Sequence, residues 1–552
     1  MKLNCALWAG LSLGLLSPCW ASESMVTQLI VQPAEFHLAH ARVLNAGEVV
    51  RFSQAAQLDL QHARAMSGQS QVLRLPKAMT HSEAKVVVAR LQASGLVRFA
   101  QIDRRVYPRM VPDDVRFSEQ WNYQSLITGK AYGENNYGLN LPGAWDITTG
   151  SSSVVVAVLD TGLLPHQDID SNILDGVGRV KPGYDFISEP EIANDGDGRD
   201  ANPTDPGDWV EKDNKLCGDG TFYPSSWHGT HVAGTVGALT NNAMGVSGVA
   251  WQVSLLPVRV LGTCGGSFSD ILDAMRWSVG MPVPGVPDNL HPARILNMSF
   301  GGVGACEAAE QSAVNDVLAK GGMLVVAAGN SGENLKTSPE TPASCSGVFT
   351  IAATDQQGQI ASYSNYGSEI ELSAPGGEQP IDTGILSTAD SGRTTANLDS
   401  SYGSSLLQYS NYDGTSMATP HVSGVLALML ALKADLGRDE ALSLLQQSAT
   451  AFPKYAKNIA FNCTTSTCGA GIVNAQAVLS QMQGSPVPPA PEPIPEPVPS
   501  PEPIPQPEPT PVPPPSSGGG GSMEWFGLLG LFGVAALRQR RRAKLKAQLK
   551  AR

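Results

Sequence analysis

Four segments in the middle of the chain are almost continuously apolar. Segments of helical length separate them, and they read VVVAVLD at 154–160, SLLPVRVL at 254–261, ARILNMSF at 293–300 and MLVVAAGN at 323–330. Short strands that are apolar on both faces and alternate with helices are typical of a parallel sheet covered on both sides. We therefore expect an α/β fold of three layers with a mostly parallel central sheet.

Polar residues stand where these apolar strands end. They are Asp160, Asn297 and Asn330. Open α/β sheets build their binding and catalytic sites beyond the carboxyl ends of the strands. We expect the functional site at this edge of the sheet.

The N-terminal 21 residues have the pattern of a secretory signal. Lys2 precedes an apolar run at 6–16, and small residues precede a cut after Ala21. A buried first helix and a lipoprotein cut before Cys19 are the alternatives. We expect residues 1–21 to be removed on export.

Residues 22–112 indicate a separate small α+β module. Strand-like stretches at 28–32, 71–75 and 97–102 surround a helical stretch at 82–94. No group of catalytic-looking residues occurs in this region. The large domain follows at 113–484.

The composition changes sharply at residue 485. Residues 485–516 are rich in proline, which sustains neither a helix nor a strand ladder, so we expect a disordered, extended linker. Residues 517–552 contain a glycine run, an apolar stretch at 525–537 and a basic end. That stretch is shorter than the about 20 residues that a membrane-spanning helix needs.

Charge and cysteine content narrow the possible roles. The net charge of −13 argues against nucleic acid as a partner, because phosphate binding needs a positive surface. Of eight cysteines, Cys5 and Cys19 leave with the signal, and an even number enters an oxidising compartment. Other pairings are open, but order along the chain favours Cys217 with Cys264, Cys306 with Cys345, and Cys463 with Cys468.

Three segments carry the residues of nucleophilic catalysis. They are VLDTG at 158–162, HGTHVAG at 228–234 and GTSMATPHVSG at 414–424. A serine hydroxyl is a weak nucleophile until a base removes its proton, and an imidazole base needs a buried carboxylate to orient it. Asp160, His228 and Ser416 are the candidates for these three roles.

The expected local structure supports this assignment. Ser416 opens an apolar run of helix formers at 417–432, and His228 precedes a small-residue helix at 229–239. Amides at a helix N-terminus favour negative charge on a substrate oxygen. Taken alone, Ser416 could be a plain helix cap, His228 a structural histidine and Asp160 a turn former.

In their order and spacing these motifs resemble the subtilisin-like serine peptidases of family S8. The resemblance covers roughly residues 121–479 and ends in GAGIVNAQAVL at 469–479. It implies that Asp160 orients the base, His228 is the general base and acid, and Ser416 is the nucleophile. It also implies that the Asn330 side chain and the Ser416 backbone NH bind the oxyanion.

The same resemblance implies how a peptide substrate binds. The peptide would add a strand between 264–268 and 299–302. The P1 pocket would lie between 297–302 and AAGN at 327–330, and Thr341-Pro342 would be a cis peptide. The implied substrate-binding residues are Gly265, Gly266, Ser267, Ser299, Phe300, Gly301 and Gly302.

The resemblance also implies structural calcium in the loop at 238–246. Its ligands would be the Asp168 and Asn242 side chains and the carbonyls of Thr240, Met244 and Val246. The acidic loop at 194–200 is a second calcium candidate, since Asp195, Asp197 and Asp200 would otherwise repel one another. Solvated loops are the alternative for both.

For the remaining segments the resemblance implies processing. Residues 22–112 would be the prosegment that templates folding and inhibits the enzyme, cut near 107–114, although a separate binding domain is possible. Residues 517–552 resemble a GlyGly-CTERM sorting signal, cut by a rhomboid-type protease after type II secretion, although an uncleaved membrane anchor is possible. We expect a monomeric enzyme, released or held at the outer surface of a Gram-negative cell.

Two rival functions stay open. The triplet Asp-Thr-Gly occurs at 160–162 and at 382–384, as in two-lobed aspartic peptidases that pair two carboxylates. Such an enzyme would leave the histidine and serine motifs unexplained. A catalytically idle surface-display protein on a peptidase scaffold is the other rival, and the complete triad argues against it.

Overall fold

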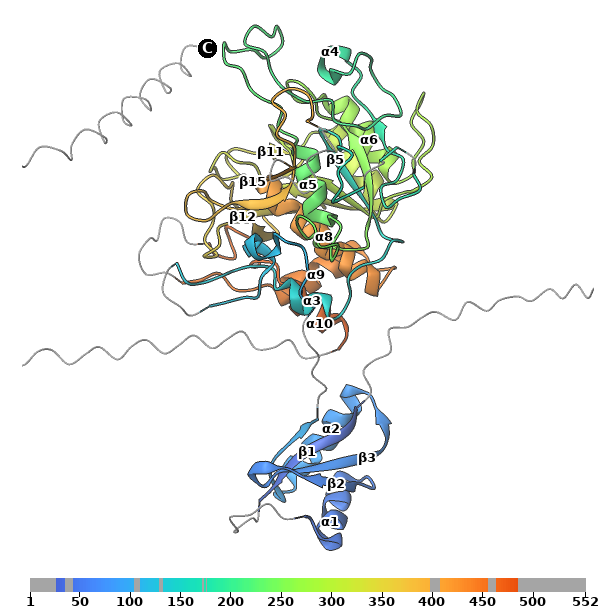
Figure 1. The fold of residues 1–552 in the computed structure, drawn as a ribbon, viewed down its shortest axis with the longest axis vertical. Helices are drawn as coiled ribbons and strands as arrows, with labels where there is room; N and C mark the ends of the chain where they lie inside the picture. Colours follow the sequence, from blue (N-terminus) through green and yellow to red (C-terminus); the bar gives the residue numbers. More distant parts are fainter. Residues whose placement is uncertain are drawn as a thin grey trace, which may run out of the picture. The chain divides into compact units, whose positions relative to one another are not determined.

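The computed structural model describes residues 26–34, 43–103, 110–128, 133–170, 173–174, 176–397, 408–454 and 463–484. The predicted signal peptide, proline-rich linker and sorting segment lie outside the described residues. The described residues form an N-terminal module and a large domain (Figure 1).

A seven-stranded parallel sheet organises the large domain. Its strand order is β13-β12-β10-β8-β5-β7-β6, and every neighbouring pair is parallel. The four apolar segments become β5, β7, β8 and β10, which confirms the predicted parallel sheet. The strands are β5 (Val155–Asp160), β6 (Tyr184–Asp185), β7 (Ser254–Arg259), β8 (Ile295–Met298), β10 (Met323–Ala327), β12 (Phe349–Thr354) and β13 (Leu372–Pro375).

Helices cover both faces of this sheet, so the fold has the three expected layers. Strand β5 illustrates this arrangement. Its residues Val156 and Val158 belong to one hydrophobic cluster, together with residues of α5 (His228–Gly237) and α8 (Thr415–Leu432). The alternate residues Ala157 and Leu159 belong to the other cluster, with α6 (Phe268–Ser278) and α7 (Ala308–Ala319). The two-residue period of a strand sends successive side chains to opposite faces.

Shorter elements complete the large domain. Helix α8 is long and apolar enough to cross a membrane by composition, but it is mostly buried among the core residues, as in a soluble protein. The remaining elements are α3 (Leu141–Trp145), α4 (Pro190–Ala193), α9 (Arg438–Ser448), α10 (Ala475–Met482), β9 (Gly302–Val303), β11 (Glu340–Thr341), β14 (Ile385–Thr388) and β15 (Tyr409–Tyr412).

The N-terminal module is a four-stranded antiparallel sheet with two helices and a hydrophobic core of its own. The predicted strands and helix are present, whereas α1 and β2 were missed. A capping box marks the start of α1 in the sequence. Glu48 N donates to Asn45 Oδ1 at 3.0 Å, and Asn45 N donates to Glu48 Oε2 at 2.8 Å. The elements are β1 (Val26–Pro33), α1 (Ala46–Ala56), β2 (Gln61–Ala65), β3 (Gln71–Met79), α2 (His81–Ala93) and β4 (Val97–Ile102).

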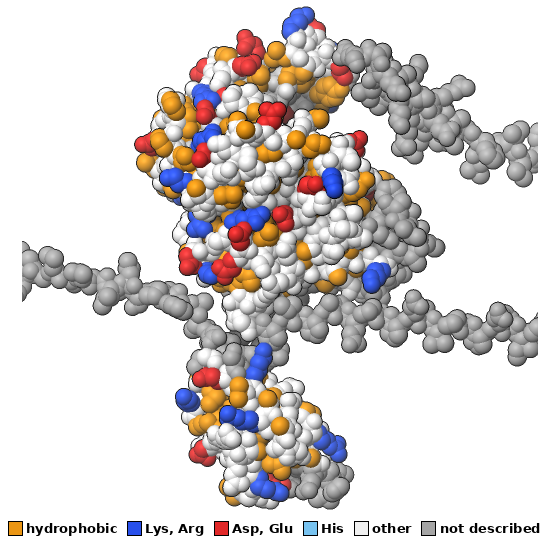
Figure 2. Space-filling model, turned by 180° about the vertical axis from the view of Figure 1, so that it is seen from behind, with side chains coloured by type: hydrophobic (Ala, Val, Ile, Leu, Met, Phe, Trp, Pro, Cys, Tyr) orange, Lys and Arg blue, Asp and Glu red, His pale blue; other side chains and the backbone are white. Residues whose placement is uncertain are grey.

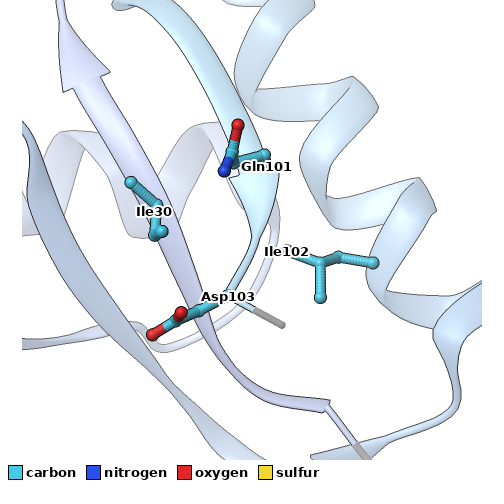
Figure 3. Close-up of a pocket in the computed structure, with 4 residues that line it drawn as sticks. All are labelled: Ile30, Gln101, Ile102 and Asp103. Atoms are coloured by element: carbon cyan, nitrogen blue, oxygen red, sulfur yellow. The ribbon is translucent and has the colours of Figure 1, made fainter. Parts of the chain in front are cut away.

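A depression on this module carries no catalytic chemistry. Figure 3 shows it beside the middle of β1 and the C-terminal end of β4, lined by Ile30, Gln101, Ile102 and Asp103. These side chains offer a single carboxylate, with no histidine, serine or cysteine beside it.

Covalent and surface features agree with a chain built for export. The three predicted disulfides form, joining Cys217 to Cys264, Cys306 to Cys345 and Cys463 to Cys468. The Thr341-Pro342 peptide is cis as expected, and Gln379-Pro380 is also cis. On the face in Figure 2, acidic and basic side chains are interspersed.

Candidate active site

The candidate base and its carboxylate meet at the carboxyl edge of the sheet. Asp160 ends β5 and is fully buried, and His228 is the first residue of α5. His228 Nδ1 donates to Asp160 Oδ1 at 2.7 Å, and Thr161 N donates to the same oxygen at 2.8 Å. The carboxylate therefore fixes the imidazole with Nδ1 protonated and Nε2 free to act as a base.

Charges around His228 adjust its basicity. Burial alone would lower the pKa of His228, but the charge and hydrogen bond of Asp160, with Asp208 and Asp205 farther away, raise it above its usual 6.5. A raised pKa suits a group that must accept a proton during the reaction.

Ser416 lies in the first turn of α8. Its Oγ donates to the carbonyl of Ser299 at 2.8 Å, and Ser299 Oγ donates to the carbonyl of Ser416 at 2.8 Å. Among the described residues no hydrogen bond joins Ser416 to His228. The hydroxyl must turn from Ser299 before His228 can take its proton, and apo sites often form such bonds only with substrate bound.

The candidate oxyanion donors are held by the residue before Ser416. Asn330 Oδ1 accepts from Thr415 N and from Thr415 Oγ1, each at 2.9 Å. This leaves the Asn330 Nδ2 protons for another acceptor. A Cβ placed on Gly414 would lie 3.6 Å from Asn330 Nδ2 and 3.5 Å from Ser416 N, so both donors border the same space.

Sequence reasoning missed three residues that support this arrangement. They are Thr415, Thr161 and Asp205. Thr161 Oγ1 donates to Asp205 Oδ2 at 2.6 Å and accepts from Gly229 N, in the first turn of α5, at 3.0 Å. Burial, and then the charge of Asp208, raise the pKa of Asp205 to about 7. Thr161 and Thr415 lie inside the recognised motifs and could have been found there, but Asp205 carries no local signal.

The two expected rims of the substrate cleft approach each other. A Cβ on Gly302 would lie 3.4 Å from the ring of Phe268, which begins α6. Gly265 has φ +98°, and a Cβ on Gly266 would lie 2.0 Å from the Val260 carbonyl, so both positions need glycine. Ser267 caps α6 rather than facing open space, since its Oγ accepts from Asp270 N at 3.4 Å.

The loop that carries Thr240, Met244 and Val246 brings the other expected calcium ligands together. Asn242 Nδ2 donates to Asp168 Oδ1 at 2.9 Å, and Val246 N donates to Asp168 Oδ2 at 2.8 Å. Burial raises the pKa of Asp168 to about 7, despite these two bonds, and nearby Asp114 also raises it. Asp168 is a buried carboxylate without an ion pair among the described residues, and nitrogen donors occupy both of its oxygens. Because Ca²⁺ takes oxygen ligands, Asn242 would have to turn its amide oxygen toward the ion for the expected ligand set to form.

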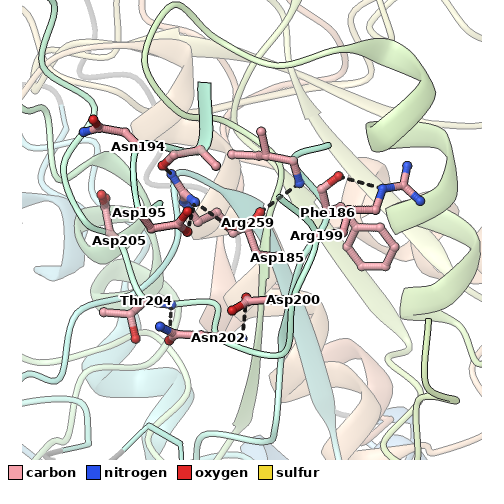
Figure 4. Close-up of polar contacts among 12 residues, drawn as sticks. Asp185, Phe186, Asn194, Asp195, Arg199, Asp200, Asn202, Thr204, Asp205 and Arg259 are labelled. Carbon is pink, nitrogen blue, oxygen red and sulfur yellow. Dashed lines mark hydrogen bonds and ion pairs between the residues drawn. The ribbon is translucent and has the colours of Figure 1, made fainter. Parts of the chain in front are cut away.

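The carboxylates of the acidic loop have protein partners in the described structure. Arg259 Nη1 lies 3.1 Å from Asp195 Oδ2, and Asp200 Oδ1 accepts from Asn202 N at 2.8 Å (Figure 4). Arg259 thus supplies positive charge beside Asp195. A second calcium site at Asp195, Asp197 and Asp200 stays a prediction.

The rival pairing of two carboxylates is also not formed. Asp382 accepts from Glu378 N at 2.9 Å, from Gly384 N at 2.8 Å and from Gln356 N at 3.0 Å. Asp160 is instead bonded to His228. Each Asp-Thr-Gly carboxylate has its own partners, so the two do not share a proton.

Comparison with known proteins agrees with this geometry. The sequence profile of the Subtilase family matches residues 151–475. The chain is 43% identical over 425 residues to an extracellular protease of Xanthomonas campestris pv. campestris, covering 77% of this chain and 66% of that protein. It is 39% identical over 458 residues to an extracellular basic protease of Dichelobacter nodosus, covering 80% of this chain and 68% of that protein.

A solved structure of a protease from Pseudoalteromonas arctica is similar in fold and sequence. It has a TM-score of 0.58 and 45% identity, covering 67% of this chain and 99% of that one. The matched family region holds all four candidate catalytic residues, with Asp160 at the end of β5, His228 and Ser416 in the first turns of α5 and α8, and Asn330 three residues after β10. The chain therefore belongs to the Subtilase family, whose members are subtilisin-like serine endopeptidases.

Proposed function

We propose that this chain is a secreted serine endopeptidase whose catalytic triad is Asp160, His228 and Ser416. The observation that carries the proposal is the 2.7 Å bond between His228 Nδ1 and buried Asp160, at the sheet edge where α5 begins. The relatives from Xanthomonas and Dichelobacter are named extracellular proteases, which supports export.

The residues perform acyl transfer in two steps. His228 Nε2 takes the Ser416 Oγ proton as Oγ attacks the peptide carbonyl, and the oxyanion accepts from Asn330 Nδ2 and Ser416 N. His228 then gives the proton to the leaving nitrogen, the C–N bond breaks, and an acyl-enzyme remains. Water then attacks this ester as His228 takes one of its protons, the bond between the acyl carbon and Ser416 Oγ breaks, and the carboxylic acid is released while His228 returns the proton to Ser416 Oγ.

Labelling with a serine-directed fluorophosphonate tests the assignment. We expect one adduct per chain, located on Ser416 by peptide mass spectrometry, because His228 makes that hydroxyl nucleophilic. His228→Ala should slow labelling by at least about 10³-fold, whereas His291→Ala, a half-exposed histidine outside the site, should label normally. An adduct on another serine, or one formed equally in His228→Ala, would contradict the proposal.

The N-terminal module fits the role of a prosegment. Its independent hydrophobic core supports folding ahead of the large domain, and it lies upstream of the family region. We propose that the enzyme removes it from itself near residues 107–114. Rhomboid-type sorting and type II secretion are proposed from the sequence alone, because residues 517–552 lie outside the described part.

Calcium is proposed to stabilise the loop around Asp168. In the Ser416→Ala background, which prevents self-digestion, we expect chelation to lower the Tm by several degrees and added Ca²⁺ to restore it, because cation binding stabilises the folded state alone. Asp168→Asn should have a lower Tm and lose this response. The control Asp195→Asn should keep it. An equal response in Asp168→Asn would place the ion elsewhere.

A further inference from the structure

An acidic side chain lies between the two walls of the proposed P1 pocket. Glu340 begins β11, which pairs with β9 at Gly302 and Val303. A Cβ on Gly301 would lie 3.1 Å from Glu340 Oε2, and one on Gly329 would lie 2.3 Å from the same oxygen. Gly301 and Gly329 come from the two segments expected to wall the pocket, and their missing side chains leave space for this carboxylate.

The carboxylate is held in place by its other oxygen. Glu340 Oε1 accepts from Asn365 Nδ2 at 2.8 Å and from Ser331 Oγ at 3.4 Å. Asn365 is fully buried and also donates to the Ala328 carbonyl at 3.0 Å, while its Oδ1 accepts from Ser331 N at 3.1 Å and Glu333 N at 3.0 Å. One buried amide thus ties Glu340 to the loop of Asn330 and leaves Oε2 toward the two glycines.

The charge of Glu340 has no partner within the described protein. No lysine, arginine or histidine nitrogen of the described residues lies within ion-pair distance of it, and the side chain is half-buried. A half-buried acid without a counter-ion favours a cationic ligand, because opposite charges attract more strongly where water is partly excluded.

We propose that Glu340 selects a lysine or arginine side chain at P1 of the substrate. The inference rests on the proposed peptidase function and adds its substrate class. A basic side chain would reach toward the carboxylate that lies beside Gly301 and Gly329, and its terminal nitrogen would donate to Glu340 Oε2, which makes a charge-assisted hydrogen bond. An apolar P1 side chain of equal length would leave the carboxylate unpaired.

Peptide substrates that differ only at P1 test this selection in the wild-type enzyme. We expect kcat/KM for lysine or arginine to exceed that for norleucine, which lacks the charge, by about 10- to 100-fold, as a charged hydrogen bond allows. This comparison needs no variant, so a folding defect cannot obscure it. Equal or higher kcat/KM for norleucine would overturn the proposal.

A pair of variants assigns the selection to one residue. Glu340→Gln should lower kcat/KM for P1 lysine by about 10- to 100-fold and change that for norleucine by less than about threefold. Glu333→Gln, an exposed neighbour, should keep the wild-type preference. An equal loss on both peptides would show that Glu340 only positions the loop through Asn365. If no peptide is cleaved in a Ser416-dependent way, the proposed function itself fails.

Discussion

Replacing Ser416 by alanine is expected to reduce proteolysis by about 10⁶-fold, because Ser416 is the proposed nucleophile and His228 its proposed base. Residual hydrolysis would come from the oxyanion donors and substrate binding alone. The measurement is casein or peptide hydrolysis by purified protein. A control, Ser443→Ala on the exposed face of α9, should retain full activity.

The same variant tests self-maturation. The intact mass of the secreted wild type should correspond to a chain that begins near residue 112, while Ser416→Ala should keep residues 22–110. A common C-terminus near Gly520 in both would support a separate sorting cut. Loss of the N-terminal module from both variants would show that another protease removes it.

Replacing Arg259 by methionine is expected to cost about 3 to 5 kcal/mol of stability, because Asp185 would remain buried without a counter-ion. The Arg259 side chain is 1% exposed and pairs with fully buried Asp185 and with Asp195. It also donates to the carbonyls of Ala193 and, at 3.1 Å, of Thr161, the residue after Asp160. Burial raises the pKa of Asp185 to about 7 even though Arg259 opposes this.

Thermal unfolding in the Ser416→Ala background measures this cost. Arg259→Met should lower the Tm by about 5 to 10 °C. Arg276→Met, which breaks the partly exposed pair with Asp316, should lower it by much less, because surface ion pairs contribute about 0 to 1 kcal/mol. Adding Asp185→Asn to Arg259→Met should recover part of the loss. Equal shifts for the two arginine variants would contradict a structural role for the buried pair.

Local patterns in the sequence determined the framework of this protein. Continuous apolar runs predicted β5, β7, β8 and β10, because a strand covered on both faces must be apolar throughout. The apolar run of helix formers after Ser416 and the small residues after His228 predicted helices α8 and α5. The order of the cysteines predicted three disulfides, since each pair joins neighbours along the chain. The elements that carry the candidate triad follow from these signals.

Partners far apart in sequence were decided only by the tertiary structure. Asn330 bonds Thr415, Thr161 bonds Asp205, and Arg259 pairs with Asp195. The order of strands in the sheet brings these residues together, and no local pattern encodes that order. Glu340 is a further example. It precedes the cis Thr341-Pro342 peptide, and its proposed role in substrate selection follows only from the tertiary structure, in which Gly301 and Gly329 from separate loops leave space for its carboxylate.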